Sequence, residues 1–526
     1  MSRTQRLEHT VSRLQMRLKE LHAEKSPNYD ASSRLPTPSS PPSPRRSSFS
    51  GSSSGSDTGP LFLGFLSGSQ SPPRSESSVV PALGSSSDCF DSNEPNFAMI
   101  DMLLPSFLPH ATQFGFFLHP HRFRDAVLSE DRRPSSALRY AVYLWGAHLS
   151  QSPSLLCFES VFLNRARQHI STEISADMHS TQLLHAIQAL VLLATYLLRV
   201  KRLLEAEFYA NGAATLVLGH HLHKIRSMHP APPLPLLAVP DFTEVYPSAP
   251  SASTVEEGER IRAFWAVACL QTHLNFSLNT AKSAFSILDF ASGEIDTPWP
   301  LEIEDYEAGL LLPGYRVQDS ILHFLMEDPF QGPPSPLCML HAKASVLLHQ
   351  TTRLGTSWSM DLGPQDLTAY TTAYSLLDRR IIAFWESLPP IYGYYDDTSA
   401  ARTLALTHAL TAAAAIRLHR SPAALDTQAQ GKCLFAARAI LDCLGDVRVG
   451  AQAIAHPVAG ALCALACGVL LDEMICARVF PVTWEKGFGV EDTELVTGMK
   501  IMEVYAAGSP LIQYQLLKLR EQYEAM

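Results

Sequence analysis

The sequence predicts an all-α protein, and three features of its patterning support this fold class. Apolar residues recur with the roughly 3.6-residue period of packed helices through most of the chain beyond about residue 96. No alternating run of strand length recurs there, and Gly and Pro separate segments of helical length. Packed pairs of helices around one large core follow from this pattern.

Composition limits the classes of function. With 526 residues, of which 46% are hydrophobic and 17% charged, the chain can bury a large core. Its formal net charge of -10 excludes a generally basic surface for nucleic acid, because phosphate contacts need clustered Lys and Arg. Any contact with DNA must therefore be local.

Cysteine usage and hydropathy predict a reduced, intracellular and soluble protein. The nine cysteines are odd in number, widely scattered and form no Cys-x-x-Cys pair. Only Cys463 and Cys467 are close, and their i, i+4 spacing on a helix favours buried small side chains over metal ligands. The N-terminus lacks an apolar signal core, and runs such as 458–471 are shorter than the roughly 20 residues of a membrane span.

Residues 2–25 have the apolar spacing of a short coiled coil. Their apolar positions step by 4, 3, 4 and 3 residues, as along the a/d seam of a heptad repeat. A helix this short is marginal alone, so the coil needs a partner. A lone amphipathic arm is the alternative. We expect a homodimer through Leu7, Val11, Leu14, Leu18 and Leu21.

Two other segments are predicted to lie outside any packed core. Residues 26–95 are rich in Ser, Pro and Gly and hold too few apolar groups to offset the entropy of ordering them, which predicts a disordered linker. Residues 229–254 are rich in Pro and predict a long exposed loop. The remaining chain, 96–526, is expected to form one helical domain.

Helical segments continue to the C-terminus. Residues 179–225 have the length and period of two or three packed helices. Six later segments are each predicted to be helical: Cys338–Gln350, Pro364–Trp385, Thr403–Arg420, Gly431–Leu444, Pro457–Cys476 and Asp492–Tyr505.

The stretch 291–309 combines a Pro-Trp-Pro sequence with six carboxylates. Paired carboxylates beside an aromatic ring can serve as general acid and base, which is the catalytic interpretation. The structural interpretation is favoured, because Pro298 and Pro300 exclude a helix interior and solvated acids are ordinary in an extended connector.

Other candidate chemistry is sparse. His220, His221, His223 and His229 lie close together in sequence, but a polar helix end explains them better than a metal site, which needs convergent ligands. The sequence contains no phosphate-binding Gly-rich loop and no His-Glu-x-x-His. We therefore expect neither catalytic nor metal-binding residues.

Five blocks carry a resemblance to a known family. They are FLPHATQFGFFLHPHRF (107–123), FYANGAATLVLGHHLHKI (208–225), VEEGERIRAFWAVACLQTHLNFSL (255–278), IDTPWPLEIEDYE (295–307) and LTHALTAAAAIRLHR (406–420). In this order they resemble the regulatory helical region of fungal binuclear zinc-cluster transcription factors of the basidiomycete type. The likeness runs over roughly residues 96–420.

The resemblance implies a nuclear regulator of RNA polymerase II transcription that acts with the transcription machinery and is not an enzyme. It also implies structural roles for the Glu-Arg-x-x-x-Phe-Trp helix and for the connector after it. The residues concerned are Glu259, Arg260, Arg262, Phe264, Trp265, Asp296, Pro298, Trp299 and Pro300.

The sequence departs from the family in two places. The family reads DNA through an N-terminal run of six cysteines that hold two zinc ions, whereas the first cysteine here is Cys89. We expect zinc only if such a cluster lies upstream, and DNA binding only through that missing module or a partner. The family's Asp-basic pair and Gly-x-Pro turn after Trp265 are replaced by Gln271, Thr272 and LNTAKSAF.

A second class of function remains open from the sequence. The large apolar core and the acidic connector are compatible with a helical small-molecule-binding protein or an enzyme of unknown reaction. A pocket for a small effector between the helices is compatible with the pattern, although no residue marks it.

Overall fold

The prediction of an all-α fold is confirmed. The computed structural model describes residues 94–129, 133–150, 152–175, 178–228, 253–279, 286–290, 295–326, 335–359, 362–424, 426–446, 454–479 and 490–526. These residues form helices and connecting segments without a β-strand, apart from an isolated bridge between Ser227 and Val317. The predicted coil, almost all of the linker and most of the Pro-rich loop lie outside the described residues.

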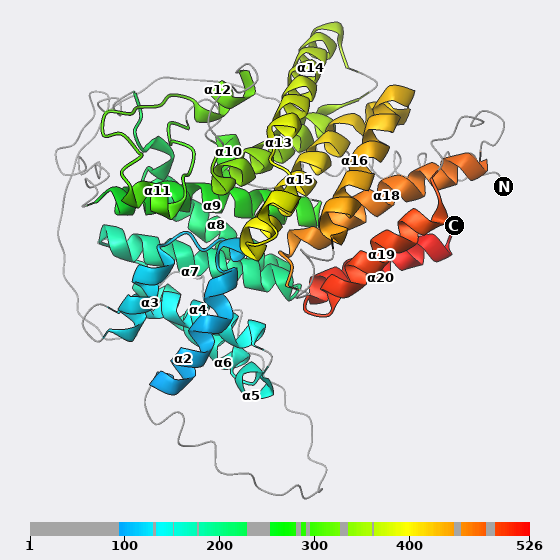
Figure 1. Cartoon of the computed structure of the whole chain (residues 1–526). Coiled ribbons are helices and arrows are strands. Elements are labelled where there is room, and N and C mark those ends of the chain that lie inside the picture. Colours follow the sequence, from blue (N-terminus) through cyan, green and yellow to red (C-terminus); the bar gives the residue numbers. More distant parts are fainter. Residues whose placement is uncertain are drawn as a thin grey trace, which may run out of the picture. The chain divides into compact units, whose positions relative to one another are not determined.

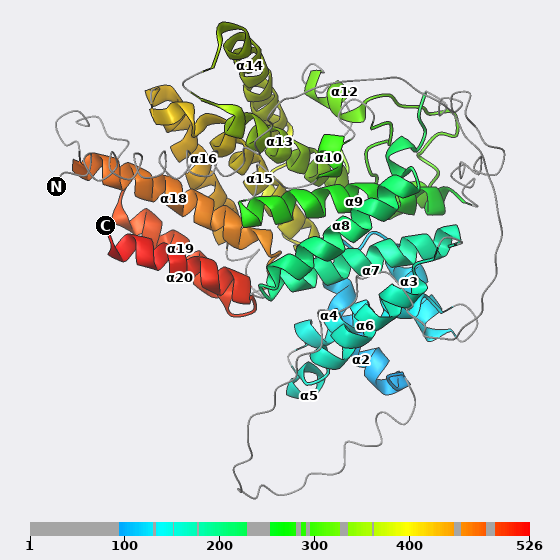
Figure 2. The same cartoon turned by 180° about the vertical axis from the view of Figure 1, so that it is seen from behind.

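The first group of helices surrounds one hydrophobic cluster (Figure 1). Its members are α2 (Phe97–Phe107), α3 (Pro120–Leu128), α4 (Ser136–Leu149), α5 (Pro153–Leu156), α6 (Glu159–Glu173), α7 (Ser180–Arg199), α8 (Leu203–Gly219) and α9 (Thr254–Leu278). Three short helices follow: α10 (Ile287–Phe290), α11 (Ile303–Glu307) and α12 (Ser320–Met326). Helices α7, α8 and α9 pack on one another and lie side by side in Figure 2.

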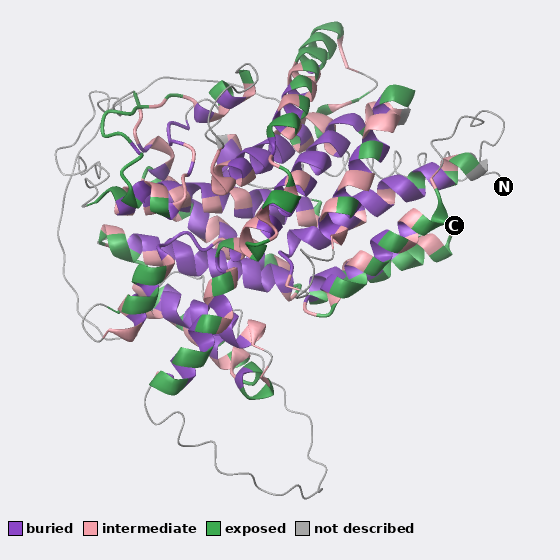
Figure 3. Ribbon diagram, in the orientation of Figure 1, coloured by how far each residue is buried: buried purple, intermediate pink, exposed green. Residues whose placement is uncertain are grey.

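Helix α7 is the centre of the first group. It contains neither Gly nor Pro, and a capping box between His179 and Gln182 satisfies its first N–H groups. Figure 3 shows that the helix is buried along most of its length. The indole of Trp145 on α4 donates a hydrogen bond to the Leu192 carbonyl at 3.0 Å, which fixes α4 against α7.

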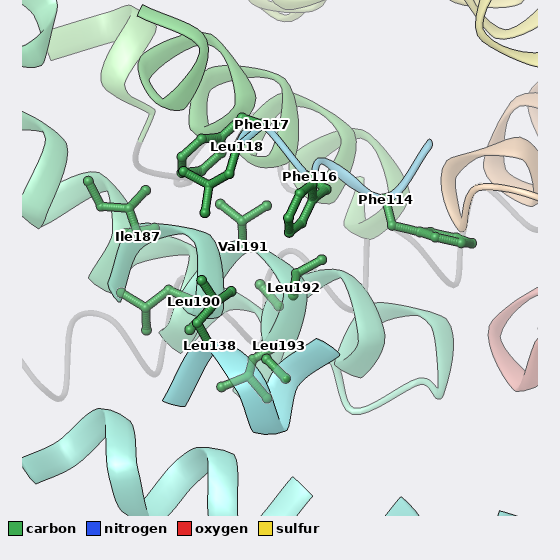
Figure 4. Packing of buried hydrophobic residues seen from close by; sticks show 14 of the residues in the cluster. Phe114, Phe116, Phe117, Leu118, Leu138, Ile187, Leu190, Val191, Leu192 and Leu193 are labelled. Atoms are coloured by element: carbon green, nitrogen blue, oxygen red, sulfur yellow. The ribbon is translucent and has the colours of Figure 1, made fainter. Parts of the chain in front are cut away.

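The aromatic segment 114–118 crosses α7 and follows two short 3₁₀ helices, η1 (Leu108–His110) and η2 (Thr112–Phe114) (Figure 4). The Gln188 side chain accepts a hydrogen bond from the Phe117 N–H at 2.7 Å and donates one to the Gly115 carbonyl at 3.1 Å. Gly115 has φ of 82°, and a Cβ there would lie 2.9 Å from Val191. Only glycine meets both demands without strain.

The second group surrounds another hydrophobic cluster. Its members are α13 (Leu337–Ser357), α14 (Pro364–Ser387), α15 (Thr398–His419), α16 (Thr427–Gly445), α18 (Val458–Val479), α19 (Asp492–Ala506) and α20 (Pro510–Glu524). Helix α15 is its centre and packs against α13, α14, α16 and α18. Four consecutive alanines, 412–415, keep α15 narrow, so its neighbours approach closely. Helix α9 also packs against α13 and α18, and thereby joins the two groups.

The six later segments predicted to be helical correspond to α13, α14, α15, α16, α18 and α19, whereas α20 was not predicted, and several boundaries differ from those expected. Helix α15 begins at Thr398 instead of Thr403, because the Asp397 side chain accepts hydrogen bonds from the N–H groups of Ser399 and Ala400 at 3.0 and 3.1 Å. Helix α13 continues to Ser357, beyond the expected end at residue 350.

Among the residues that the structure describes, two helices are long and apolar enough, by length and composition, to cross a membrane. They comprise the windows Ser180–Arg199 and Val458–Ala477, although the sequence suggested that such runs were too short. The shares of these windows that are buried inside the protein are 83% and 78%. Core helices of soluble proteins pass the same test, so these two helices are weak evidence for a membrane span.

We expect opposite effects from one substitution at two helical glycines. A Cβ at Gly146 would lie 2.5 Å from the Leu103 carbonyl oxygen, so Gly146→Ala should force α2 and α4 apart and cost about 1–3 kcal/mol. Nothing lies within 4 Å of a Cβ at Gly468 in α18, so Gly468→Ala should stabilise the protein by up to about 1 kcal/mol. Urea unfolding of both variants measures the two signs. Equal stability of the two variants would contradict the described packing of α2 on α4.

Candidate functional site

Two of the blocks singled out in the sequence meet at one joint. The indole of Trp265 on α9 donates a hydrogen bond to the Pro298 carbonyl at 2.7 Å. The rings of Trp265 and Trp299 stack with centroids 4.2 Å apart and planes 18° apart, and Phe264 meets Trp265 edge-on at 5.0 Å. Trp299 packs against both hydrophobic clusters. The connector is thus fixed on α9 where the two helix groups join.

The connector forms neither helix nor strand over 295–302, in keeping with its prolines, but the expectation of solvated acids is wrong for Asp296. This side chain is only 2% exposed. It accepts hydrogen bonds from the Asp319 N–H at 3.0 Å and from the Ser227 hydroxyl, and Lys224 Nζ lies 3.4 Å away. Burial alone would raise the pKa of Asp296, but these partners lower it below its usual value. Asp296 therefore holds the connector as a buried carboxylate.

The acidic residues after the connector form a short helix instead of a continuing loop. Glu302 and Asp305 form a capping box at the start of α11. Glu302 also accepts a hydrogen bond from the Cys338 N–H at 3.0 Å and lies 3.7 Å from the Arg262 guanidinium. These carboxylates are held in helix caps and ion pairs, which is a structural arrangement.

The other charged residues of α9 contact the first helix group. Glu259 accepts a hydrogen bond from the His119 N–H at 2.9 Å, and burial raises the pKa of Glu259. Arg260 pairs with Glu256 at 3.0 Å and donates a hydrogen bond to the Ser180 hydroxyl at 2.5 Å. Of the predicted residues, the structure thus brings Trp265 together with Pro298 and Trp299, whereas Glu259 and Arg260 contact other elements. Asp296 likewise bonds to residues outside α9, and the role of these residues in the family stays a prediction.

The remaining candidates from the sequence separate into two sets. Leu7, Val11, Leu14, Leu18 and Leu21 lie outside the described residues. Cys463 and Cys467 are fully buried in α18, and burial raises the pKa of the Cys467 thiol to about 12, as for inert core side chains. In the described part of the chain, no group of three or more His, Cys, Asp or Glu side chains could hold a metal ion.

A cavity of about 750 Å³ adjoins the joint. Its walls come from the segment 112–117, from α9, from the connector and from the first turns of α13 and α15. Arg262, Trp265, Pro300 and Glu302 all line it, so the residues that fasten the connector also form one wall of the space.

Three histidines form the inner end of this cavity. The ring of His273 on α9 lies 5.2 Å from that of His341 on α13 and 5.0 Å from that of His456, which precedes α18. Burial lowers the pKa of His341 to about 4 and that of His456 to about 3, and it lowers the pKa of His273 well below its usual value. At neutral pH the inner end is therefore polar but uncharged.

Sequence reasoning missed these histidines. Each is a single histidine in an apolar helix or at its edge, and 68 or more residues separate neighbouring members in the chain (His273 to His341). No local spacing connects them, because only the packing of α9 against α13 and α18 brings them together.

We expect the two stacked tryptophans to respond differently to Phe. Trp265→Phe leaves the buried Pro298 carbonyl without its donor, and should cost about 1–3 kcal/mol more than Trp299→Phe. Trp299→Phe is the matched control, because both substitutions replace one indole of the same stacked pair with a smaller ring. The indole of Trp299 makes no hydrogen bond within the described residues. Urea unfolding measures the difference. A cost for Trp299→Phe equal to or above that for Trp265→Phe would contradict it.

Comparison with known protein families supports the resemblance seen in the sequence. Residues 104–286 match the model of the fungal specific transcription factor domain. The matched stretch runs from α2 through α9, whereas the connector and α10 to α20 lie beyond it. No match was found among curated proteins, and none among solved structures. The chain thus contains a fungal specific transcription factor domain.

Proposed function

We propose that this chain is the dimerising and regulatory part of a fungal zinc-cluster transcription factor that acts on RNA polymerase II in the nucleus. The observation that carries the proposal is the match of residues 104–286 to the fungal specific transcription factor domain. The ordered sequence blocks beyond residue 286 and the joint of Trp265 with the connector support the same assignment. The regulated step is transcription, and the chain itself catalyses no reaction.

DNA recognition belongs to another module in this proposal. The chain carries a net charge of -10, and residues 2–25 have a basic excess of only +3, from six Lys or Arg and three Glu. So few charges support at most a weak phosphate contact. Reading a sequence requires side chains placed on base edges, at about 1–3 kcal/mol for each good bidentate pair. A six-cysteine zinc cluster, upstream or on a partner chain, supplies that contact.

A basic coil that enters the major groove is the competing arrangement. Such a helix carries its basic residues before the dimer seam, as in basic-region zippers. Within residues 2–25, by contrast, four of the six basic residues lie within or after the seam, namely Arg13, Arg17, Lys19 and Lys25. The coil is therefore a dimerisation element, and the helical domain receives or transmits the regulatory signal.

Selection of bound sequences from a random DNA pool tests the division of roles. The 526-residue chain alone should retain DNA weakly and without a motif, whereas the same chain fused behind a zinc-cluster module should select one. A reproducible motif from the chain alone would overturn the proposal. The fused protein is the matched control, since it shows that the helical chain is folded and compatible with DNA binding.

The dimer is tested by Leu14→Pro, which breaks a helix near the centre of the seam. Analytical ultracentrifugation should show a concentration-dependent dimer for the unchanged chain and a monomer for the variant. An unchanged sedimentation mass in the variant would show that the coil is not the dimer contact. Circular dichroism checks that the helical domain keeps its structure.

A further inference from the structure

We propose that the 750 Å³ cavity beside the Trp265–Trp299 joint binds an uncharged organic molecule with an apolar body and a hydrogen-bonding end. Ligand pockets in proteins span roughly 300–1,000 Å³, mostly apolar with a few convergent polar groups. The cavity has this size, and about half of its lining residues are apolar while the other half are polar. The inference concerns binding by the chain itself and does not depend on the proposed role in transcription.

The apolar part of the cavity is built from aromatic and aliphatic side chains. Phe114 and Phe116 form one wall, Trp265 and Leu270 of α9 form the second, and Leu337 at the start of α13 forms the third. Rigid aromatic walls favour a flat ring system or a compact hydrocarbon, because such bodies bury area at little cost in conformational entropy.

The polar part is the inner end, where the cavity meets a smaller one of about 60 Å³. Thr403 and the uncharged rings of His341 and His456 line both spaces, and so does Gln113. Gln113 donates its Nε2 to the Ile454 carbonyl at 3.0 Å, while its Oε1 is buried and has no hydrogen-bond partner in the described structure. A buried acceptor of this kind costs free energy until a donor reaches it. A hydroxyl or amide N–H of the ligand supplies that donor.

Charge excludes anions from the same space. Four carboxylates line the large cavity against the guanidinium of Arg262, and Arg402 lines the smaller one, which leaves a formal lining charge of -2 with the histidines neutral. Repulsion of this sign opposes a carboxylate or phosphate ligand. The carboxylates are Glu302, Glu304, Asp305 and Asp397.

Those carboxylates do not form a site for a cation either. Glu302 and Asp305 form the capping box of α11, and Asp397 caps α15, so three of the four are engaged with backbone N–H groups. The inner end holds no carboxylate to pair with a buried ammonium, and Arg402 beside it would repel one, so burying an ammonium there is costly. An uncharged ligand is the class that remains.

Two fluorescent naphthalene probes of different charge test the class of ligand. The full chain should bind the uncharged probe N-phenyl-1-naphthylamine, whose N–H is a hydrogen-bond donor, saturably with one site per chain, and its sulfonated form 1-anilinonaphthalene-8-sulfonate at least about tenfold more weakly. Glu304→Lys on the cavity wall should strengthen binding of the sulfonate by at least about threefold and leave the uncharged probe unchanged. Equal affinities for the two probes, or no saturable binding of the uncharged one, would overturn the proposal.

Filling the cavity tests its location. Ala266 of α9 faces the cavity, so Ala266→Trp should lower the affinity for the uncharged probe by at least about tenfold. Ala369→Trp is the matched control, since Ala369 is exposed on α14 and does not line the cavity. The affinity of this variant for the uncharged probe should equal that of the unchanged chain. If Ala266→Trp fails to fold by circular dichroism, Ala400→Phe on the α15 wall takes its place. Full binding by a folded variant of either kind would show that the probe lies elsewhere.

Discussion

The stack of Trp265 on Trp299 is the contact on which the arrangement of the two helix groups depends. Trp299 packs against both hydrophobic clusters and meets Phe324 edge-on at 5.5 Å. The bond from Trp265 to the Pro298 carbonyl fixes where the connector crosses α9. Residues of the same joint form a wall of the large cavity. The contact between the two clusters and the proposed ligand space therefore share side chains.

The helices could be predicted from the sequence because the signal is local. A 3.6-residue apolar period identifies a helical segment without knowledge of its neighbours, and it predicts α7 and the six helices α13, α14, α15, α16, α18 and α19, although not α20. Their ends were less accurate, since a cap depends on one side chain reaching particular N–H groups. Asp397 shows the difficulty, because it extends α15 by a turn before the first strongly apolar residue.

The candidate site was predictable only in part, for a related reason. Pro298 and Pro300 require an extended backbone wherever they occur, so the connector could be read directly. The burial of Asp296 could not be predicted from the sequence, because its partners Lys224 and Ser227 lie about 70 residues earlier in the chain. The cavity depends even more on distant packing, since its inner end combines residues of α9 and α13 with His456 before α18, which lie far apart in sequence.

The histidine trio gives the hydrophobic interior a sensitivity to mild acid. The folded chain holds His273, His341 and His456 neutral, with pKa values below the usual value near 6.5, whereas the unfolded chain protonates them near that value. As the pH falls below about 6.5 the unfolded state binds more protons, so folding loses free energy until the buried rings titrate as well. The loss begins in the pH range of acidified cell compartments, well above the range where carboxylates protonate. The free energy of unfolding thus depends on the pH around the protein as well as on the temperature.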